Sequence, residues 1–345
     1  MPGESKVLWA DSGSTQGGLA GAAFAVNGDA RRALTLASTL AAVPRPGEGH
    51  TAQLFDTLST LAAADLTAAR VAEAHLDARA ILHQAGYPAR PDQTWGVFAA
   101  ESAGPAVTAT RVGDRWRLDG IKPWCSLAGL LSHALVTARV SGSTGDPCRR
   151  LFAVDLRDLG IRVHDDAWVA RGLCQVTSGP VDFSAVTADP VGDEGWYLRR
   201  RGFAWGGIGV AAVWWGGAVG MARTLYDSTA NRTPDQIALA HLGAVDVAVT
   251  GSKLALGAAA LAIDAGEADG PAGSLLAARV RALVARTVDE VVFRIGHALG
   301  PAPLALDARH AQRVADLQLY VRQHHAERDD AALGRMLVAR GSAPW

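Results

Sequence analysis

Apolar residues recur at helical intervals in the first part of the chain. From Thr51 to Ala85 the spacing of leucines and valines fits one face of a helix, and the residues before it are rich in Ala and Leu. This pattern predicts two or three helices before the segment Tyr87–Pro91, whose prolines interrupt a helix. We therefore expect an N-terminal helical domain over residues 1–92.

The middle of the chain changes to short β-like runs separated by turns. Val107–Val112 and Arg115–Asp119 flank a tight Gly-Asp turn and predict a hairpin, and the runs 134–140 and 151–156 predict further strands. Such spacing favours a small antiparallel barrel or sandwich. We assign residues 93–195 to a middle antiparallel β-barrel domain.

Helical periodicity returns after Gly195 and continues to the end of the chain. The order helical, β, helical predicts an α+β fold whose C-terminal domain, residues 196–345, is a four-helix bundle. Breaks that contain proline or glycine separate its four predicted helices, which lie near 208–229, 235–266, 272–299 and 307–337.

One uncharged segment, 203–222, reaches the minimum length of a membrane span. Its many glycines and its Trp214-Trp215 pair are more typical of a helix packed closely inside a protein. Arginines flank it on both sides, so the charge asymmetry of a single span is missing. We expect a buried helix and no membrane span.

Composition excludes some functions. The chain has 33 Lys+Arg against 34 Asp+Glu, and its net charge is -1. It therefore lacks the excess of positive charge that is typical of proteins that bind nucleic acid. Its three cysteines, Cys125, Cys148 and Cys174, have no CxxC spacing, which fits a reducing compartment and disfavours a zinc site. The first residues also lack the order of a signal peptide, so we expect a cytoplasmic protein.

Common catalytic motifs are missing from the sequence or lie in the wrong context. Gly207-Ile-Gly209-Val-Ala-Ala212 fits a dinucleotide fingerprint, but arginines precede it where a strand is needed, so we interpret it as a chance match. The sequence contains no GxSxG, P-loop or HExxH motif. His324, His325 and Glu327 are a possible metal cluster, but a polar helix surface or a pocket lining is favoured, and we expect no metal.

The segment Gly120–Ser126 carries the most suggestive chemistry. A Trp followed two residues later by a hydroxyl, as in Trp124 and Ser126, could stack on a planar ring and hydrogen-bond its heteroatoms. The alternative, a Trp that anchors the rim of a barrel, is favoured on chemistry alone. Likewise, the tryptophans at 205, 214 and 215 either narrow a pocket or pack the core, and packing is favoured.

The chain resembles acyl-CoA dehydrogenase-type flavoproteins in domain order and in two motifs. Gly120–Ser126 is similar to the family's G-x-K-x-W-[I]-[TS] segment, and Phe98–Gly104, which contains Glu101, is similar to its T-E-P-x-A-G strand end. The resemblance implies bound FAD with Trp124 and Ser126 beside the isoalloxazine ring. The resemblance covers residues from about 50 to the end, with a shortened N-terminal domain.

The C-terminal part resembles the family less closely. Arg232 corresponds to an arginine that reaches the FAD pyrophosphate across a subunit interface, although the Phe-Gly that usually follows is absent. His297-Ala-Leu-Gly300-Pro301 resembles the Q-x-x-G-G turn that holds the adenine half. The resemblance implies a homodimer or homotetramer, or a paralogous partner subunit.

The family's catalytic glutamate is not found in this sequence. Counting from Asp316 places His324 or His325 at its position, and a histidine can act as a base near neutral pH. The leading hypothesis is an enzyme that oxidises an acyl thioester at its α,β-carbons with hydride transfer to flavin. Alternatives are a flavin monooxygenase or oxidase acting on another small molecule, and a non-catalytic subunit that has lost the base.

Overall fold

The N-terminal region of the computed structural model consists of short and medium helices. The structure describes residues 18–101, 104, 106–143, 149–231, 233–343 and 345. The first four helices are α1 (Leu19–Val26), α2 (Ala30–Ser38), α3 (Thr51–Ala64) and α4 (Leu66–Gln84).

Aspartates set two of the boundaries between these helices. Asp29 caps α2 by accepting a hydrogen bond from the backbone N–H of Arg32, and Asp65 caps α4 by accepting one from that of Ala68. Asp65 is itself extended and ends α3. The expectation of two or three helices is therefore wrong, because single capping residues divide stretches whose apolar spacing is continuous.

Seven strands form one sheet that closes on itself. They are β1 (Trp95–Phe98), β2 (Thr108–Val112), β3 (Arg115–Lys122), β4 (His133–Val140), β5 (Arg149–Asp155), β6 (Ile161–Val163) and β7 (Val181–Val191). The order is β1-β4-β2-β3-β7-β5, and β5 pairs with β4 again while β6 pairs with β7. A barrel-like sheet is thus present.

The pairing corrects the expectation of a purely antiparallel barrel. The predicted β2–β3 hairpin is confirmed, with Val112 opposite Arg115 across the turn. However, β4 runs parallel to both β1 and β2. The reason is that β4 does not follow β1 or β2 directly in the chain, so no hairpin turn, which would make the strands antiparallel, joins these pairs.

Seven helices follow the sheet: α5 (Trp196–Arg199), α6 (Phe203–Ala230), α7 (Gln236–Asp264), α8 (Gly270–Leu299), α9 (Ala302–Leu306), α10 (Ala308–Tyr320) and α11 (Glu327–Ala339). Three of the four predicted long helices correspond to α6, α7 and α8. The fourth, predicted over 307–337, is broken into α10, a 3-10 turn and α11. Ala326, with φ 47°, makes the break.

Helix α6 is the apolar segment that resembled a membrane span. Both α6 and α7 are long and apolar enough to cross a bilayer by length and composition, but most of α6 is buried inside the protein. Its glycines permit this burial: a Cβ on Gly216 would lie 2.3 Å from the carbonyl oxygen of Ser59 on α3. Gly207 and Gly209 lie within the helix, where no phosphate-binding turn can form.

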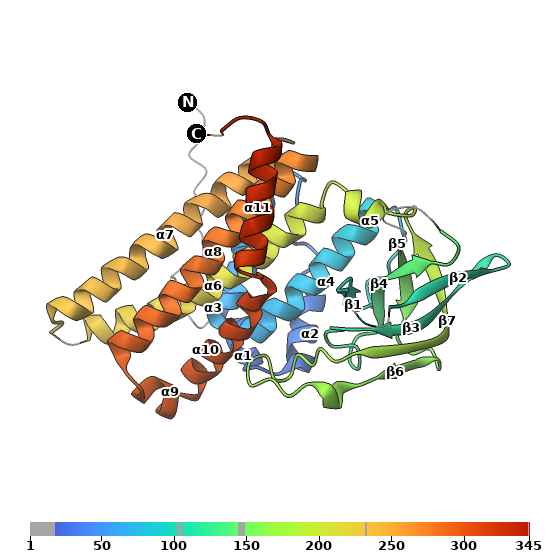
Figure 1. Ribbon diagram of the computed structural model, residues 1–345. Coiled ribbons are helices and arrows are strands. Elements are labelled where there is room, and N and C mark those ends of the chain that lie inside the picture. Colours follow the sequence, from blue (N-terminus) through green and yellow to red (C-terminus); the bar gives the residue numbers. More distant parts are fainter. Residues whose placement is uncertain (1–17, 102–103, 105, 144–148, 232, 344) are drawn as a thin grey trace.

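The sheet and the long helices lie side by side, with α4 between them (Figure 1). One face of α4 packs on the sheet through a core cluster made of Ala78, Ile81, Leu82, Trp95, Leu135, Leu151, Ala153, Val191 and Tyr197. Helix α4 also contacts α6. The motifs at the end of β3 therefore meet the helical region at α4.

Candidate functional site

The loop that follows β3 holds Trp124 in a strained conformation. Trp124 and Leu127 have φ of 59° and 61°, which are costly for residues that carry a side chain. The N–H groups of Cys125 and Leu127 donate to the carbonyls of Gly179 and Thr177 and fix this loop in place. As a result the Trp124 side chain is 61% exposed, and its ring stands edge-on to that of Trp168 at 6.4 Å.

Ser126 joins this loop to helix α4. The Ser178 hydroxyl donates to the carbonyl of Val176, so the Ser126 hydroxyl donates to Ser178 at 2.8 Å. Arg70 Nη2 in turn donates to Ser126 Oγ at 3.2 Å. The structure therefore places an exposed indole and a guanidinium-bound hydroxyl two residues apart, at the junction between sheet and helices.

Behind Arg70 lies a buried network that the sequence interpretation missed. Arg70 Nη1 and the Tyr320 hydroxyl both donate to Glu73 Oε2, at 2.8 Å and 3.0 Å. Burial, together with the nearby carboxylate of Asp77, raises the pKa of Glu73 although Arg70 opposes this rise. The available signal was Arg70, Glu73 and Asp77 at spacings of three and four in an otherwise apolar helix, which places them on one face.

Glu101 does not contact Trp124 or Ser126; it belongs to a different ion pair. Its carboxylate accepts from Nζ of Lys122, a side chain that is 2% exposed and also bonds Thr137. Burial alone raises the pKa of Glu101, but Lys122 and Arg149 outweigh it and lower the pKa overall. Glu101 therefore neutralises the lysine of the Gly120–Ser126 segment.

His324 and His325 lie at the break between α10 and α11 and differ in exposure. The His325 side chain is 60% exposed and lies 3.4 Å from Asp329, whereas His324 is 8% exposed. His324 Nδ1 accepts the N–H of Ala326, which places the ring proton of the neutral imidazole on Nε2. Burial lowers the pKa of His324, which favours this neutral form.

The buried Nε2–H of His324 has no hydrogen-bond partner within the described part of the chain. Arg281, whose guanidinium donates to the carbonyls of Gly207 and Gln323, ties the break to α6 and contributes to the lowered pKa of His324. His324 is thus arranged as a hydrogen-bond donor rather than as a base.

The predicted adenine-binding residues lie elsewhere. His297 packs on Phe293 near the end of α8, and Gly300, with φ 66°, ends that helix. This end lies beside α9, away from the sheet (Figure 1). Arg232 lies outside the described residues. No contact in the described ranges joins His297 or Gly300 to Ser126 of the same chain.

No family model and no curated protein matches this chain. Several solved structures match it over most of its length. An FMN-bound structure of TdsC, a dibenzothiophene monooxygenase from Paenibacillus sp. A11-2, matches with a TM-score of 0.77 at 17% identity and covers 94% of this chain and 96% of that one. KijD3 in complex with FMN and a dTDP-linked amino sugar matches with a TM-score of 0.72 at 20% identity, over 92% and 85% of the two chains.

A Tcur3481-Tcur3483 steroid ACAD is similar to the same degree, with a TM-score of 0.72 at 20% identity over 94% of this chain and 97% of that one. Identities this low establish the fold and leave the reaction open. The expected mixed helix-and-sheet architecture is confirmed in these coarse terms. The chain has the fold of acyl-CoA dehydrogenase-type proteins.

Proposed function

We propose that this protein is a flavin-dependent oxidoreductase in which the flavin ring lies against Trp124 and Ser126. The observation that carries the proposal is the strained loop, which holds an indole out of the core directly beside a hydroxyl that Arg70 polarises. Backbone strain of this kind accumulates at ligand sites. A planar aromatic heterocycle satisfies both groups at once, by stacking and by hydrogen bonding.

The residues present fit such a ring. Trp124 offers an exposed aromatic face, Ser126 keeps an acceptor lone pair, and Arg70 places a positive charge behind the hydroxyl. When bound, the flavin would supply hydride transfer or oxygen chemistry. These side chains bind and orient the ring.

We propose FAD as the flavin, with its pyrophosphate reached by Arg232 and its adenine half held by His297 and Gly300 of a second copy. The separation of His297 and Gly300 from Ser126 within one chain supports this arrangement. Flavin released from the purified protein by heat identifies the cofactor by chromatography, and release of FMN alone would overturn the assignment.

The state of His324 bears on the reaction. A base must accept a proton, but Nδ1 of His324 is occupied and Nε2 carries the ring proton. This favours a monooxygenase or oxidase, in which a buried donor is useful, over the dehydrogenation of an acyl thioester, which requires a base. Both remain candidate functions of the same site.

Anaerobic mixing separates the two reactions. Saturable reduction of bound flavin by acyl thioesters without oxygen would establish the dehydrogenase. Oxygen uptake with reduced flavin and no dependence on CoA would establish the monooxygenase or oxidase. A colourless protein that releases all added FAD and FMN would overturn the proposal in favour of a non-catalytic subunit.

A further inference from the structure

A pocket of about 180 Å³ lies beside the buried network and includes Glu73 in its lining. Helices α3, α4 and α6 and the segment 41–46 contribute most of its lining. Its walls are mostly apolar, and its lining includes Val43, Leu54, Leu58, Leu76, Ala80 and Trp205. The volume is comparable with that of an apolar cavity of about 150 Å³ that binds benzene, so the pocket fits a small molecule of that order of size.

Two carboxylates line this pocket from one face of α4. Glu73 is 8% exposed, and its Oε2 takes both bonds of the buried network, whereas its Oε1 has no hydrogen-bond partner within the described ranges. Asp77, one turn further on, lies 3.5 Å from Arg200 through Oδ1, and its Oδ2 likewise accepts no bond from a described residue. The pocket therefore presents two acceptor oxygens and needs a ligand that donates.

The positive charges around the pocket are already engaged. Arg70 bonds Glu73 and Ser126, and Arg200 bonds Gln84 beside Asp77. Arg281 binds backbone carbonyls. Burial nevertheless raises the pKa values of both Glu73 and Asp77, so these guanidinium groups do not fully offset the cost of two buried charges.

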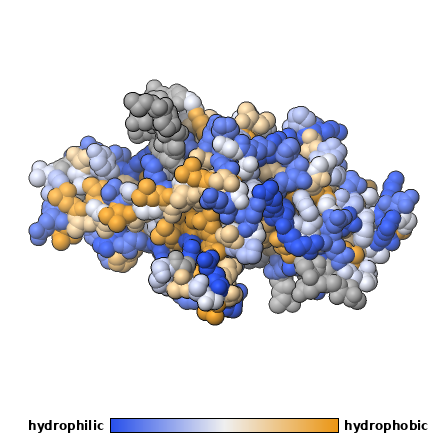
Figure 2. Space-filling view, turned by 90° about the horizontal axis from the view of Figure 1, so that it is seen from above, coloured by the Kyte–Doolittle hydropathy of each residue, from blue (hydrophilic) through white to orange (hydrophobic). Residues whose placement is uncertain are grey.

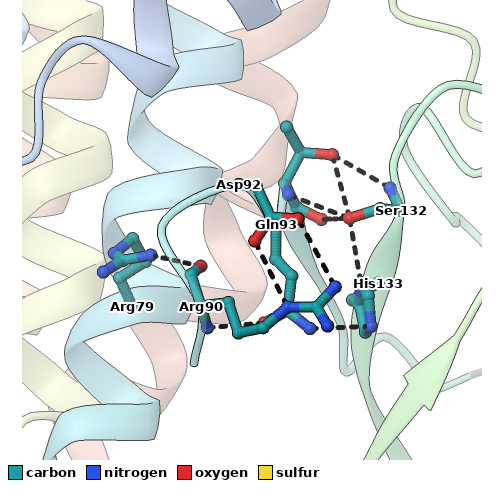
Figure 3. Close-up of polar contacts among 7 residues, drawn as sticks. Arg79, Arg90, Asp92, Gln93, Ser132 and His133 are labelled. Atoms are coloured by element: carbon teal, nitrogen blue, oxygen red, sulfur yellow. Dashed lines mark hydrogen bonds and ion pairs between the residues drawn. The ribbon is translucent and has the colours of Figure 1, made fainter. Parts of the chain in front are cut away.

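The basic residues Arg45 and Arg79 of the lining are more exposed than Glu73, and the third basic residue, His75, is buried with its pKa lowered to about 4, so its imidazole is neutral near pH 7. Arg45 pairs with Glu48, and both side chains are 41% exposed. Arg79 donates to the carbonyl of Arg90, in a loop that Gln93 anchors to His133 on β4 (Figure 3). The most deeply buried charged side chain of the lining is therefore the Glu73 carboxylate.

Trp205 adds an aromatic wall. Its indole N–H donates to the carbonyl of Ala268 at 2.7 Å, which fixes the ring against Gly47 and along the pocket. The indole face attracts cations, most strongly where water is excluded. Two carboxylates, an aromatic wall and apolar sides together suit a ligand that carries an ammonium group on an apolar body.

We propose that this pocket binds a small, largely apolar molecule that carries one ammonium group, held by Glu73 Oε1 and Asp77. Arg70 links Glu73 to Ser126 at the proposed flavin site through two hydrogen bonds. The statement that this ligand is the enzyme's substrate therefore rests on the proposed function. Binding itself does not depend on flavin.

Calorimetric titration of the full chain, with and without flavin, tests this inference. The probes are cyclohexylmethylamine, cyclohexylmethanol and cyclohexanecarboxylate, which share one body and differ in charge. We expect the amine to bind at least about tenfold more tightly than the alcohol, since a charge-assisted hydrogen bond contributes about 1.5–3 kcal/mol. Equal affinities, preference for the carboxylate, or no binding of any probe would overturn the proposal.

Substitutions locate the binding. Glu73→Gln and Asp77→Asn should each remove most of the preference for the amine, whereas Asp114→Asn, at the exposed β2–β3 turn, should retain it. Gly209→Leu provides a test that leaves both carboxylates intact. A Cβ on Gly209 meets only Leu58, at 3.7 Å, so the added side chain has room to fill the pocket and should abolish binding of amine and alcohol alike.

The outcomes also separate this inference from the proposed function. A protein that retains flavin but shows no preference for the amine refutes the inference alone. A protein that binds the amine through Glu73 but takes up no flavin refutes the proposed function alone. Amine binding that all three pocket substitutions leave unchanged lies elsewhere on the molecule and also refutes the inference.

Discussion

Arg70 donates hydrogen bonds to two groups of different charge, the Ser126 hydroxyl and the Glu73 carboxylate. Ser126, beside the exposed Trp124, takes one of its N–H groups, and the buried Glu73 takes another. Because arginine keeps its charge at any ordinary pH, both neighbours have a permanent cation. The planar guanidinium can serve both at fixed angles, which a lysine ammonium could not do equally well.

Removal of the Ser126 hydroxyl tests the first of these roles. Ser126→Ala leaves Arg70 Nη2 without its acceptor and takes away the hydroxyl proposed to bind flavin, so flavin affinity should fall about tenfold. Fluorescence titration of FAD and FMN measures it. Ser274→Ala, which removes a hydroxyl bonded only within α8, is the control. An unchanged dissociation constant for Ser126→Ala would contradict the assignment.

His75 makes the protein sensitive to acid. It is 5% exposed and accepts the N–H of Trp95, and burial lowers its pKa to about 4. Between the unfolded value of 6.5 and about 4, the unfolded chain binds a proton that the folded chain does not, so stability falls as the pH falls. The loss from pH 7 to pH 5 should be about 2 kcal/mol.

Urea unfolding of the His75→Asn variant checks this prediction. The variant should lose less stability between the two pH values than the wild-type chain. Comparison at each pH cancels other titrations, including that of Asp316, whose pKa burial raises to about 6. His83→Gln, on the exposed part of the same helix, should behave like the wild type. Parallel pH profiles for His75→Asn and the wild type would refute the assignment.

At the level of elements, the boundaries are set by single residues. The apolar spacing placed α6, α7, α8 and the β2–β3 hairpin well, because long periodic runs and a Gly-Asp turn have few competing structures. It missed the division at Asp65 and the break at Ala326, since neither interrupts the apolar period. Capping and positive φ depend on local hydrogen bonds and packing, and the spacing of apolar residues contains no information about either.

The contact between α3 and α6 depends on a missing side chain. Gly216→Ala would place a Cβ 2.3 Å from the Ser59 carbonyl oxygen and force the helices apart, at a cost of about 1–3 kcal/mol. Gly334→Ala, in α11, meets nothing within 4 Å and should instead stabilise by about 1 kcal/mol through helix propensity. Chemical denaturation measures both. Similar effects of the two substitutions would show that α6 is not closely packed at this point.

At the scale of the whole molecule, one helix is covered on one side only. Helix α7 is apolar along its length but largely unburied. Its exposed large apolar residues are Ile237, Leu239, Val247, Leu254 and Leu261, at 51–73% exposure. Apolar side chains gather over the helical half of the surface in Figure 2. A second copy of the chain would cover them, in agreement with the proposed sharing of the flavin site.

Light scattering after gel filtration tests this association. The wild-type chain should elute with the mass of a dimer or tetramer. The double substitution Val247→Glu and Leu254→Glu should shift it to the monomer, because two charges buried in an interface cost several kcal/mol. Leu159→Glu, fully exposed on the sheet side, should leave the mass unchanged. A monomeric wild-type chain would contradict the prediction.

The candidate site was only partly predictable at this scale. The order of helices and strands, with the segment Gly120–Ser126, pointed to the loop that holds Trp124 and Ser126. The pocket lined by Glu73 and Asp77 was not foreseen, since an acidic residue in an amphipathic helix usually faces water and only tertiary packing turned these two inward. Of the three singled-out tryptophans, Trp214 and Trp215 are buried in the core, and Trp205 both packs and lines the pocket.

Because Lys122 is buried, the reactivity of its amine measures how often the barrel-like sheet opens. The chain contains only three lysines, and the amine of this one is bound by Glu101 and Thr137 within the barrel. An acylating reagent cannot reach that amine until the barrel separates. After a brief pulse of reagent, mass spectrometry of the peptide that contains Lys122 would therefore count the opened molecules directly, without a dye or an engineered cysteine.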